Sequence, residues 1–316
     1  MKFPPTGFLL LSALLIPVLP GHIDAQNIST DIPAPEGTNA PSGKVLAPKF
    51  LKGQTYRFVS VSGIRMDIPG RGRREVKVEQ QARLEASDRA AGKPGVAIRA
   101  LTEKLFVSIK SGQKTVSYDS FKAEDKETTL GKHFQSAVNR WVILQLDPKM
   151  RIVDSREGGR VGAATPLPGM PQFGPDELKQ LVGSIPQGFA PDPVKPGDEW
   201  VLKGEKEVSQ AGKLDFDITY RHLGPFDYEG YPCIQIEFSG TMSGGAGTGN
   251  FDGTTVVGKM YFDPEIKMIR YSEQTVSMTL ELPAPGQPGM KMQVPMGQKV
   301  ASRLLHIVPT KVKEEE

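Results

Sequence analysis

Apolar and polar residues alternate along much of the second half of the chain. In LDFDITYRHL (residues 214–223), four apolar residues occupy alternate positions, namely Leu214, Phe216, Ile218 and Tyr220. IQIEF (234–238) and VSMTLEL (276–282) follow the same rule. A period of two is typical of a β-strand with one face in the core and one face in water. Because parallel strands are buried on both faces and apolar throughout, the alternation predicts antiparallel strands.

Helical patterns are rare in this sequence. Pro175 precedes DELKQLVGSI, which has an acidic first turn and an apolar stripe of Leu178, Leu181 and Val182, and this pattern predicts a short helix. The stretch GKHFQSAVNRWVI (131–143) is ambiguous and is interpreted as a helix that gives way to a strand. The predicted helix lies within a Pro-rich connection at residues 161–198, which is the best candidate for a boundary between two β regions.

The regions on the two sides of this connection repeat similar features. LKGQTYRFVSV (51–61) is similar to VKPGDEWVLKG (194–204), and VILQLDPKMRIV (142–153) is similar to GKMYFDPEIKMIRY (258–271). Asp147-Pro148 and Asp263-Pro264 suit tight turns, because the Asp carboxylate accepts backbone hydrogen bonds and the Pro ring presets φ. We interpret both as equivalent hairpin turns rather than as functional carboxylates.

The expected fold class is therefore mainly β. Two divergent antiparallel β repeats, at residues 51–160 and 199–309, are predicted to form a curved sheet, a half-barrel or a sandwich, joined by the Pro-rich linker with its one short helix. The segment from Gly53 to Asp147 is longer than the segment from Gly197 to Asp263, so the first repeat is expected to carry an insertion.

The ends of the chain indicate its location. Lys2 is followed by an apolar run at residues 7–19 and by the small residue Ala25, which predicts a signal peptide at residues 1–25 and a mature start near Gln26. An uncleaved membrane anchor is the alternative, although the run is shorter than the roughly 20 residues of a spanning helix. Residues 26–50 predict a disordered lead, and residues 310–316 a charged tail. The protein is expected to be exported, to the periplasm or the extracellular space.

Composition adds few constraints on partners. The formal net charge is +3, which points to no acidic partner, and no nucleic-acid partner is predicted. The chain has one cysteine, Cys233, which excludes an internal disulfide framework. The alternation of the strand places Cys233 on the polar face, opposite Ile234. The alternatives there are an unreactive free thiol and a disulfide bond between two chains. No transmembrane segment is expected after signal cleavage, and the oligomeric state is left open.

The candidate chemical motifs are weak. The Gly-rich stretch 240–254 lacks the Gly-Lys-Ser/Thr ending of a phosphate-binding loop, and is interpreted as a loop between strands. Soft sulfur ligands can bind Cu(I), but methionine also fills cores, and both roles are open for Met290, Met292 and Met296. An arginine cluster can hold a polyanion or form a solvated turn, and these alternatives apply to Arg71, Arg73 and Arg74. The mature chain has three histidines without metal-ligand spacing, His133, His222 and His306, which we interpret as structural. No catalytic, cofactor-binding or metal-binding residue is assigned, and no cofactor is expected.

Together with the predicted signal peptide, three stretches carry a resemblance: KGQTYRF (52–58), VSYDS (116–120) and PDPVKPGDEW (191–200). They resemble an uncharacterised family of exported, β-rich bacterial proteins, which implies an envelope or secreted location and a two-part β architecture but no functional residue. The expected function is non-catalytic, a binding or structural role at the cell envelope in which a curved sheet could hold an apolar ligand. The alternative is a secreted hydrolase with a site dispersed over loops.

Overall fold

The sequence has 316 residues. A computed structural model describes residues 43–70, 72–89, 92–134, 137–138, 140–158, 175–208, 212–244, 251–283 and 290–310. The predicted signal peptide, most of the predicted lead, Arg71, residues 159–174 of the Pro-rich connection and most of the charged tail lie outside these ranges. Within them, no helix is long and apolar enough to cross a membrane.

The described part of the chain is built mainly from long strands. Before the Pro-rich connection come β1 (Gln54–Ile68), β2 (Gly72–Asp88), β3 (Val96–Ser111), β4 (Lys114–Asp119), α1 (Ala123–Lys126), α2 (Thr129–Phe134), β5 (Trp141–Leu146) and β6 (Ile152–Gly158). After it come α3 (Pro175–Ser184), β7 (Glu199–Val208), β8 (Gly212–Tyr228), β9 (Tyr231–Gly244), β10 (Thr254–Asp263), β11 (Met268–Pro283) and β12 (Lys291–Pro309). The ambiguous stretch 131–143 does begin in helix α2 and end in strand β5.

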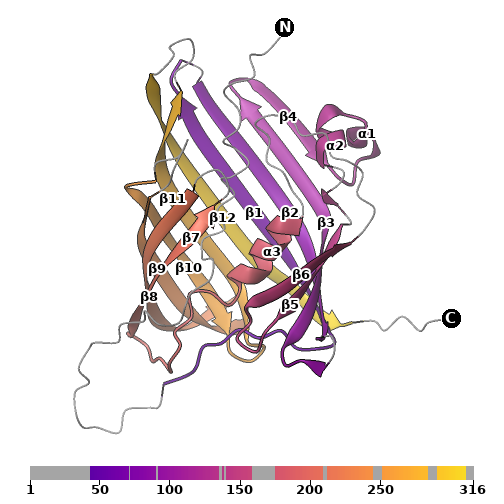
Figure 1. Cartoon of the computed structure of the whole chain (residues 1–316), viewed down its shortest axis with the longest axis vertical. Coiled ribbons are helices and arrows are strands. Elements are labelled where there is room, and N and C mark those ends of the chain that lie inside the picture. The colour runs from indigo at the N-terminus through magenta and orange to yellow at the C-terminus, as the bar shows by residue number, and fades with distance from the viewer. Residues whose placement is uncertain are drawn as a thin grey trace, which may run out of the picture.

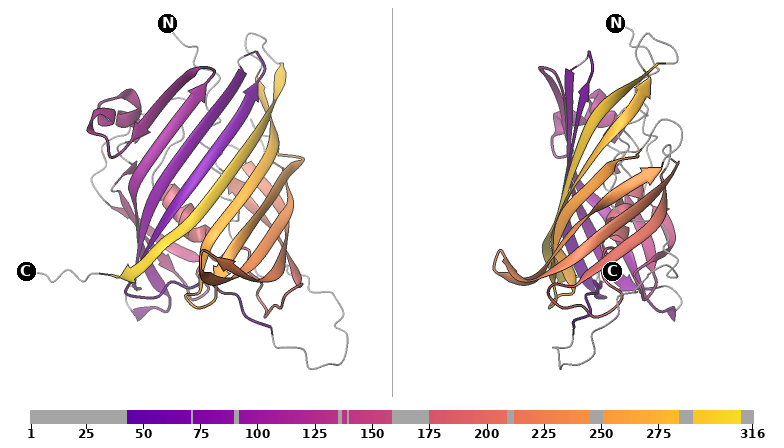
Figure 2. Two further views of the ribbon diagram at one scale, coloured as in Figure 1. Left: turned by 180° about the vertical axis from the view of Figure 1, so that it is seen from behind. Right: turned by 90° about the vertical axis from the view of Figure 1, so that its left-hand side faces the viewer.

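All twelve strands form one antiparallel sheet, in the order β6-β5-β3-β2-β1-β12-β11-β10-β9-β8-β7, with β4 paired to β3 outside this path. The sheet is strongly curved (Figures 1 and 2), and helix α3 lies on its concave side. The first and last strands, β1 and β12, pair in the middle of the sheet, whereas β6 and β7 form its two edges. The prediction of a mainly β, antiparallel fold is confirmed, and the two halves form one continuous sheet.

The two halves have the same strand order. Strands β1, β2, β3, β5 and β6 form one meander, and β7, β8, β9, β10 and β11 form another. Asp147 follows the fourth strand of the first meander and Asp263 ends the fourth strand of the second, so both lie at the hairpin turns that the sequence predicts. The additional elements β4, α1 and α2 lie between β3 and β5, where the longer first half would carry an insertion. This equivalence supports the predicted duplication.

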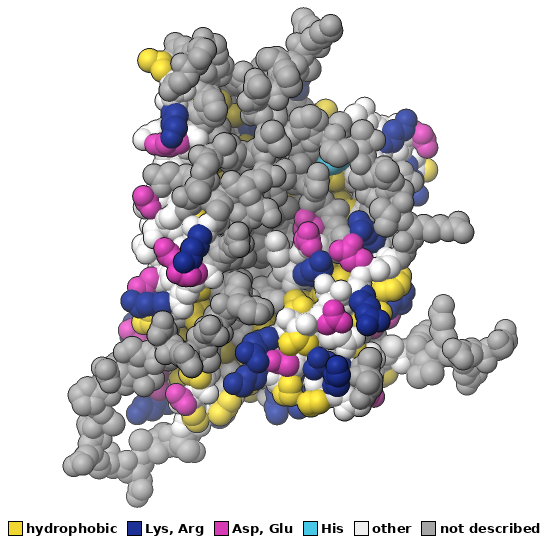
Figure 3. Space-filling model, viewed as in Figure 1, with side chains coloured by type: hydrophobic (Ala, Val, Ile, Leu, Met, Phe, Trp, Pro, Cys, Tyr) yellow, Lys and Arg dark blue, Asp and Glu magenta, His cyan; other side chains and the backbone are white. Residues whose placement is uncertain are grey.

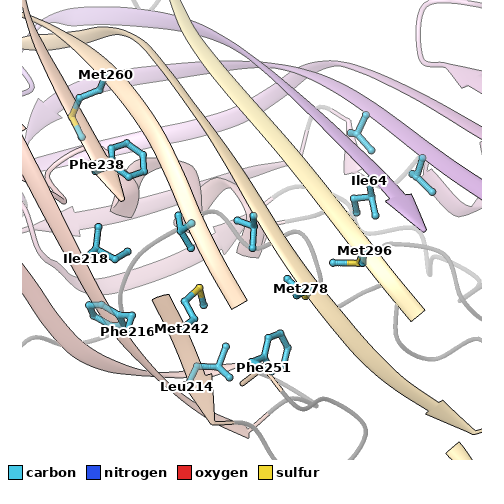
Figure 4. Packing of buried hydrophobic residues seen from close by; sticks show 14 of the residues in the cluster. Ile64, Leu214, Phe216, Ile218, Phe238, Met242, Phe251, Met260, Met278 and Met296 are labelled. Atoms are coloured by element: carbon cyan, nitrogen blue, oxygen red, sulfur yellow. The ribbon is translucent and has the colours of Figure 1, made fainter. Parts of the chain in front are cut away.

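The alternation in the sequence determines which side chains face the concave side. In β8 the four apolar residues of LDFDITYRHL are buried, as predicted: Leu214, Phe216, Ile218 and Tyr220. Figure 4 shows Phe216 and Ile218 near Phe238 and Met242, with Met278 beside Met296 on the neighbouring strands. A second apolar cluster lies around α3, whose Leu178 and Val182 pack against the sheet. Burial of these two stripes is the main stabilising contribution to the fold.

The chain just before β1 is packed against the sheet. Leu46 and Phe50 are buried, and the backbone N–H of Lys44 donates to the carbonyl oxygen of Val194 at 2.9 Å. Phe50 also contacts Tyr56 edge to face, with ring centroids 5.0 Å apart. The prediction of a disordered lead is therefore wrong for residues 43–50, because a few apolar residues in a Pro-rich stretch are enough to anchor it. Residues 26–42 of that lead lie outside the described residues.

Candidate functional site

A cavity lies between α3 and the concave face of the sheet. Its lining comes from β1, β2, β8, β9, β10, β11 and β12, from α3 and from the residues that follow α3. The cavity has a volume of about 150 Å³, comparable to engineered cavities that hold a benzene molecule. Because its lining joins residues that are more than 200 positions apart in sequence, only the pairing of β1 with β12 in the assembled sheet creates it.

Most of the cavity wall is apolar. The sheet contributes aromatic and aliphatic side chains, which are Phe58, Val78, Tyr220, Phe238, Met260, Ile269 and Val300. Helix α3 and the turn after it add Leu181 and Ile185 from the opposite side. Ligand sites are typically of this kind, with apolar walls and a few polar groups that fix the orientation of the ligand.

A polar belt crosses the floor of the cavity. Directly opposed residues on β2, β1, β12 and β11 form one row, which consists of Gln80, Ser60, Ser302 and Ser272. Ser62 and Gln274 lie in the adjoining row, and Gln298 lies one row further, directly opposite Ile64 and Val276. We refer to these seven residues as the polar belt. The row of Gln80, Ser60, Ser302 and Ser272 separates the two apolar clusters, since Ile64 and Val78 belong to one cluster and Phe58 and Ala82 to the other.

Some groups of the polar belt are buried without a hydrogen bond in the described structure. Gln298 is 1% exposed, and neither its Nε2 nor its Oε1 has a partner; the Oγ of buried Ser62 has none either. Gln80, by contrast, donates from Nε2 to Oγ1 of Thr102 at 2.7 Å. Leaving a buried polar group unsatisfied costs about 1–3 kcal/mol. The unpartnered groups of Gln298 and Ser62 therefore call for a partner, which an ordered water or a bound ligand in the cavity would supply.

The floor of the cavity carries no available charge among the described residues. Glu273 touches the cavity, but its carboxylate lies on the convex side, where it binds Lys299 at 3.1 Å, Lys259 at 3.2 Å and the hydroxyl of Tyr271 at 3.0 Å. Lys299 and the other donors lower the pKa of Glu273 despite its partial burial. Glu177, on α3, is the other acidic residue of the lining. On the face of the molecule shown in Figure 3, Lys and Arg side chains are interspersed with Asp and Glu side chains.

The chemical groups in the cavity are suited to hydrogen bonding. The described lining has serine hydroxyls and glutamine amides but no histidine, cysteine, lysine, arginine or aspartate. A serine nucleophile needs an adjacent base for activation. The described groups can therefore donate to and accept from an uncharged ligand, and they include no histidine to activate a nucleophile.

The segment after α3 is fixed to the second half of the sheet. Trp200 donates from its ring nitrogen to the carbonyl oxygen of Gly188 at 3.2 Å, and it stacks on Tyr220 with ring centroids 5.7 Å apart. Gly188 has φ of +78°, and a Cβ there would lie 2.5 Å from the Tyr220 ring, so glycine is required for this close approach. This contact positions α3 over the cavity.

The residues singled out in the sequence do not form a site. His133 and His222 are buried in separate regions, His306 lies beside Arg57, and no group of three metal-ligating His, Cys, Asp or Glu residues occurs in the described ranges. His133 packs edge to face on Phe134, with ring centroids 4.6 Å apart. Burial lowers the pKa of His222. These contacts support the structural interpretation of the histidines.

The methionines are also separated. Met296 is buried in the core and Met292 packs against it, whereas Met290 is 60% exposed. The packing of Met292 and Met296 is that of core gap-fillers, which favours this role over copper binding.

The structure distinguishes between the alternatives for Cys233. Cys233 lies opposite Phe226 on the neighbouring strand and is buried, and this burial raises its pKa to about 11. A buried, protonated thiol favours an unreactive free thiol over a bond between chains.

The arginines of the cluster differ in exposure. Arg73 pairs with Asp67 at 3.0 Å, whereas Arg74 is buried and burial lowers its pKa. The prediction of a solvated turn thus fits Arg73 and is wrong for Arg74; Arg71 lies outside the described residues. The Gly-rich stretch does connect two strands, β9 and β10, although residues 245–250 are not described.

Sequence reasoning missed the polar belt altogether. A signal was present in GQKVASRLL (297–305), where Gln298 and Ser302 occupy the inward positions on either side of Val300. A polar residue at an inward position of an alternating strand is a recognisable exception.

Comparison with known proteins assigns no activity. No family model and no curated protein matches the chain. A lipovitellin structure concerned with lipid–protein interactions is similar over 85% of this chain, with 11% identity and a TM-score of 0.46, and the match covers 27% of the lipovitellin chain. A DUF1329 family protein from Desulfovibrio piger has 8% identity and a TM-score of 0.18, over 82% of this chain and 87% of that one. A putative outer membrane lipoprotein-sorting protein domain from Vibrio parahaemolyticus has 6% identity and a TM-score of 0.16, with the same coverage of both chains. At these identities and TM-scores no family is assigned, and no functional residue is carried over to this chain.

Proposed function

We propose that this protein is a non-catalytic binding protein that holds an apolar ligand between α3 and the concave face of its sheet. The observation that carries the proposal is the cavity itself, whose apolar walls come from both halves of the sheet and from α3. Internal space in a protein is normally filled by side chains, because a void forfeits packing contacts. A cavity closed by a helix that is anchored through Gly188 and Trp200 is suited to ligand binding.

A fluorescent apolar dye tests this function. N-phenyl-1-naphthylamine is uncharged, becomes fluorescent in apolar surroundings and carries a benzene-sized phenyl ring, so titration into the purified protein reports whether this end of the dye enters the cavity. Ser302→Leu and Ser272→Leu place larger side chains into the cavity from two paired strands, and each is expected to weaken dye binding by about tenfold or more. Ala301→Leu is the matched control, because this residue is the neighbour of Ser302 and faces the opposite side of the sheet.

Either of two results would overturn the proposal. The first is that the dye does not bind the wild-type protein. The second is that Ser302→Leu and Ser272→Leu both bind the dye as the Ala301→Leu control does, although their melting temperatures show that they are folded.

We also propose that the protein acts outside the cytoplasm, in the periplasm or the extracellular space. The support is the apolar run at residues 7–19 followed by Ala25. Amino-terminal peptide sequencing of protein isolated from its own cells should find a start near Gln26. Recovery of peptides that contain residues 1–20 would contradict export with cleavage.

A further inference from the structure

We propose that the polar belt binds the uncharged head of an amphipathic ligand, one that carries a hydroxyl, ester or amide group on an apolar body. This inference rests on the proposed binding function and names the ligand class. Its starting point is Gln298, whose amide is buried, lines the cavity and has both Nε2 and Oε1 without a partner in the described structure. A glutamine amide offers donors and an acceptor side by side, which matches a carbonyl, a hydroxyl or a second amide.

The neighbours of Gln298 extend this match. Ser62 also presents a buried and unpartnered hydroxyl to the cavity, and it lies on β1, the strand that pairs with the strand of Gln298. Ser60 and Ser302 are directly opposite each other on the same two strands. Together these groups form a polar surface in the middle of an otherwise apolar floor, so that a head group would be recognised here and an apolar body would contact the walls.

Charge decides which head group fits. The described lining has no lysine, arginine or histidine to neutralise a carboxylate or a phosphate, and the carboxylate of Glu273 is engaged on the other side of the sheet. An anionic head would therefore lose its hydration without gaining a partner charge, which is strongly unfavourable. The cavity should accordingly discriminate against fatty acids in favour of alcohols, esters and amides of the same chain length.

The size of the cavity limits what enters. A volume of about 150 Å³ accepts a benzene-sized group, which corresponds to a head group with its first carbons. The cavity is thus suited to one end of a longer molecule or to the whole of a small one.

Competition with a matched series of ligands tests the inference. Octanamide, 1-octanol and octanoate share one chain length and differ in the head group, and each can displace N-phenyl-1-naphthylamine from the full-length mature protein at neutral pH. Octanamide and 1-octanol are expected to compete at concentrations about tenfold lower than octanoate. Equal or better competition by octanoate would overturn the inference while leaving the proposed binding function intact.

A substitution series identifies the belt as the site of discrimination. Gln298→Met preserves the length of the side chain and removes its hydrogen-bonding groups, so octanamide affinity should fall by about tenfold relative to dye affinity. The melting temperature should stay equal or rise, because an unsatisfied buried amide is replaced by an apolar group; a merely structural glutamine would give the opposite shift. Gln293→Met is the matched control on the same strand, since Gln293 is exposed.

A second variant covers the case in which Gln298→Met does not fold. Ser62→Ala removes the other unpartnered hydroxyl with a minimal change of volume, and it should lower the preference for 1-octanol over octanoate by a few-fold. Unchanged head-group preference in every folded belt variant would show that the belt does not contact the ligand, and the inference would then be wrong.

Discussion

The turn at Asp147 and the turn at Asp263 use similar hydrogen bonds at different depths in the protein. In the first, Oδ1 of Asp147 accepts from the backbone N–H groups of Lys149 and Arg151, both at 2.9 Å. In the second, Oδ1 of Asp263 accepts from Glu265 at 2.9 Å and from Ile266 at 3.3 Å. In both turns the Oδ2 atom accepts from an arginine Nε at 2.8 Å, from Arg151 and Arg270 respectively.

Burial is what distinguishes the two turns. The side chain of Arg151 is 63% exposed, whereas that of Arg270 is 13% exposed and that of Asp263 only 2%. The guanidinium of Arg270 also lies over the Tyr231 ring, 3.7 Å from its centroid. The first half thus pairs a largely buried carboxylate, 12% exposed, with a solvated guanidinium, whereas both partners are buried in the second half. Because desolvated charges depend on each other far more than solvated ones, the two pairs should contribute unequally to stability.

The largest effect is expected from Asp263→Ala. It leaves the Arg270 guanidinium buried without its carboxylate, and loss of one partner of a buried pair costs about 3–5 kcal/mol. Urea unfolding monitored by circular dichroism should show this decrease in the free energy of unfolding.

The double variant Asp263→Ala/Arg270→Met is the control for that measurement. It removes both charges and should recover part of the loss, since no uncompensated charge remains. A decrease of less than about 1 kcal/mol in the free energy of unfolding of Asp263→Ala would mean that burial does not increase the contribution of this ion pair to stability.

Asp147→Ala should have a smaller effect, a decrease of about 1–2 kcal/mol in the free energy of unfolding. The substitution removes two side-chain-to-backbone hydrogen bonds, but the Arg151 side chain remains hydrated. The same urea experiment measures it, and ligand or dye binding should be unchanged in the folded protein. Lost binding with an unchanged free energy of unfolding would make Asp147 a functional carboxylate and would break the equivalence of the two turns.

Local features of the sequence predicted local features of the fold. The Asp-Pro pairs predicted both turns, the alternation in residues 214–220 predicted the buried face of β8, and the acidic first turn after Pro175 predicted α3. Each of these signals lies within about ten residues, where backbone preferences and periodicity determine the structure.

What the sequence did not reveal depends on distant strands. Gln80, Ser60, Ser302 and Ser272 form one row only when β1 pairs with β12, so no single strand reveals the row. The difference in exposure between Arg151 and Arg270 could not be predicted from the sequence either, because the two arginines occur in similar local sequences. Depth in the fold is a property of the assembled sheet, so neither the cavity nor the difference between the turns follows from local patterns.

The smallest effect concerns pH and sharpens the description of the exposed turn. Burial of Asp147 opposes ionisation, but the hydrogen bonds from the backbone and the guanidinium of Arg151 more than compensate, and the pKa of Asp147 lies below its usual value. A lowered pKa in the folded state means that the carboxylate stabilises the protein above its unfolded pKa of about 3.9, and that this contribution disappears as the pH falls through the folded pKa.

Asp147→Asn keeps an acceptor for the backbone but not the charge. Wild type should therefore exceed this variant in the free energy of unfolding by up to about 1 kcal/mol near neutral pH, the range of exposed pairs. Urea unfolding at a series of pH values should show the difference shrinking as the pH falls below about 4. A difference that stays constant down to about pH 2 would show that the charge of Asp147 contributes nothing, and that hydrogen-bond geometry alone sustains the exposed turn.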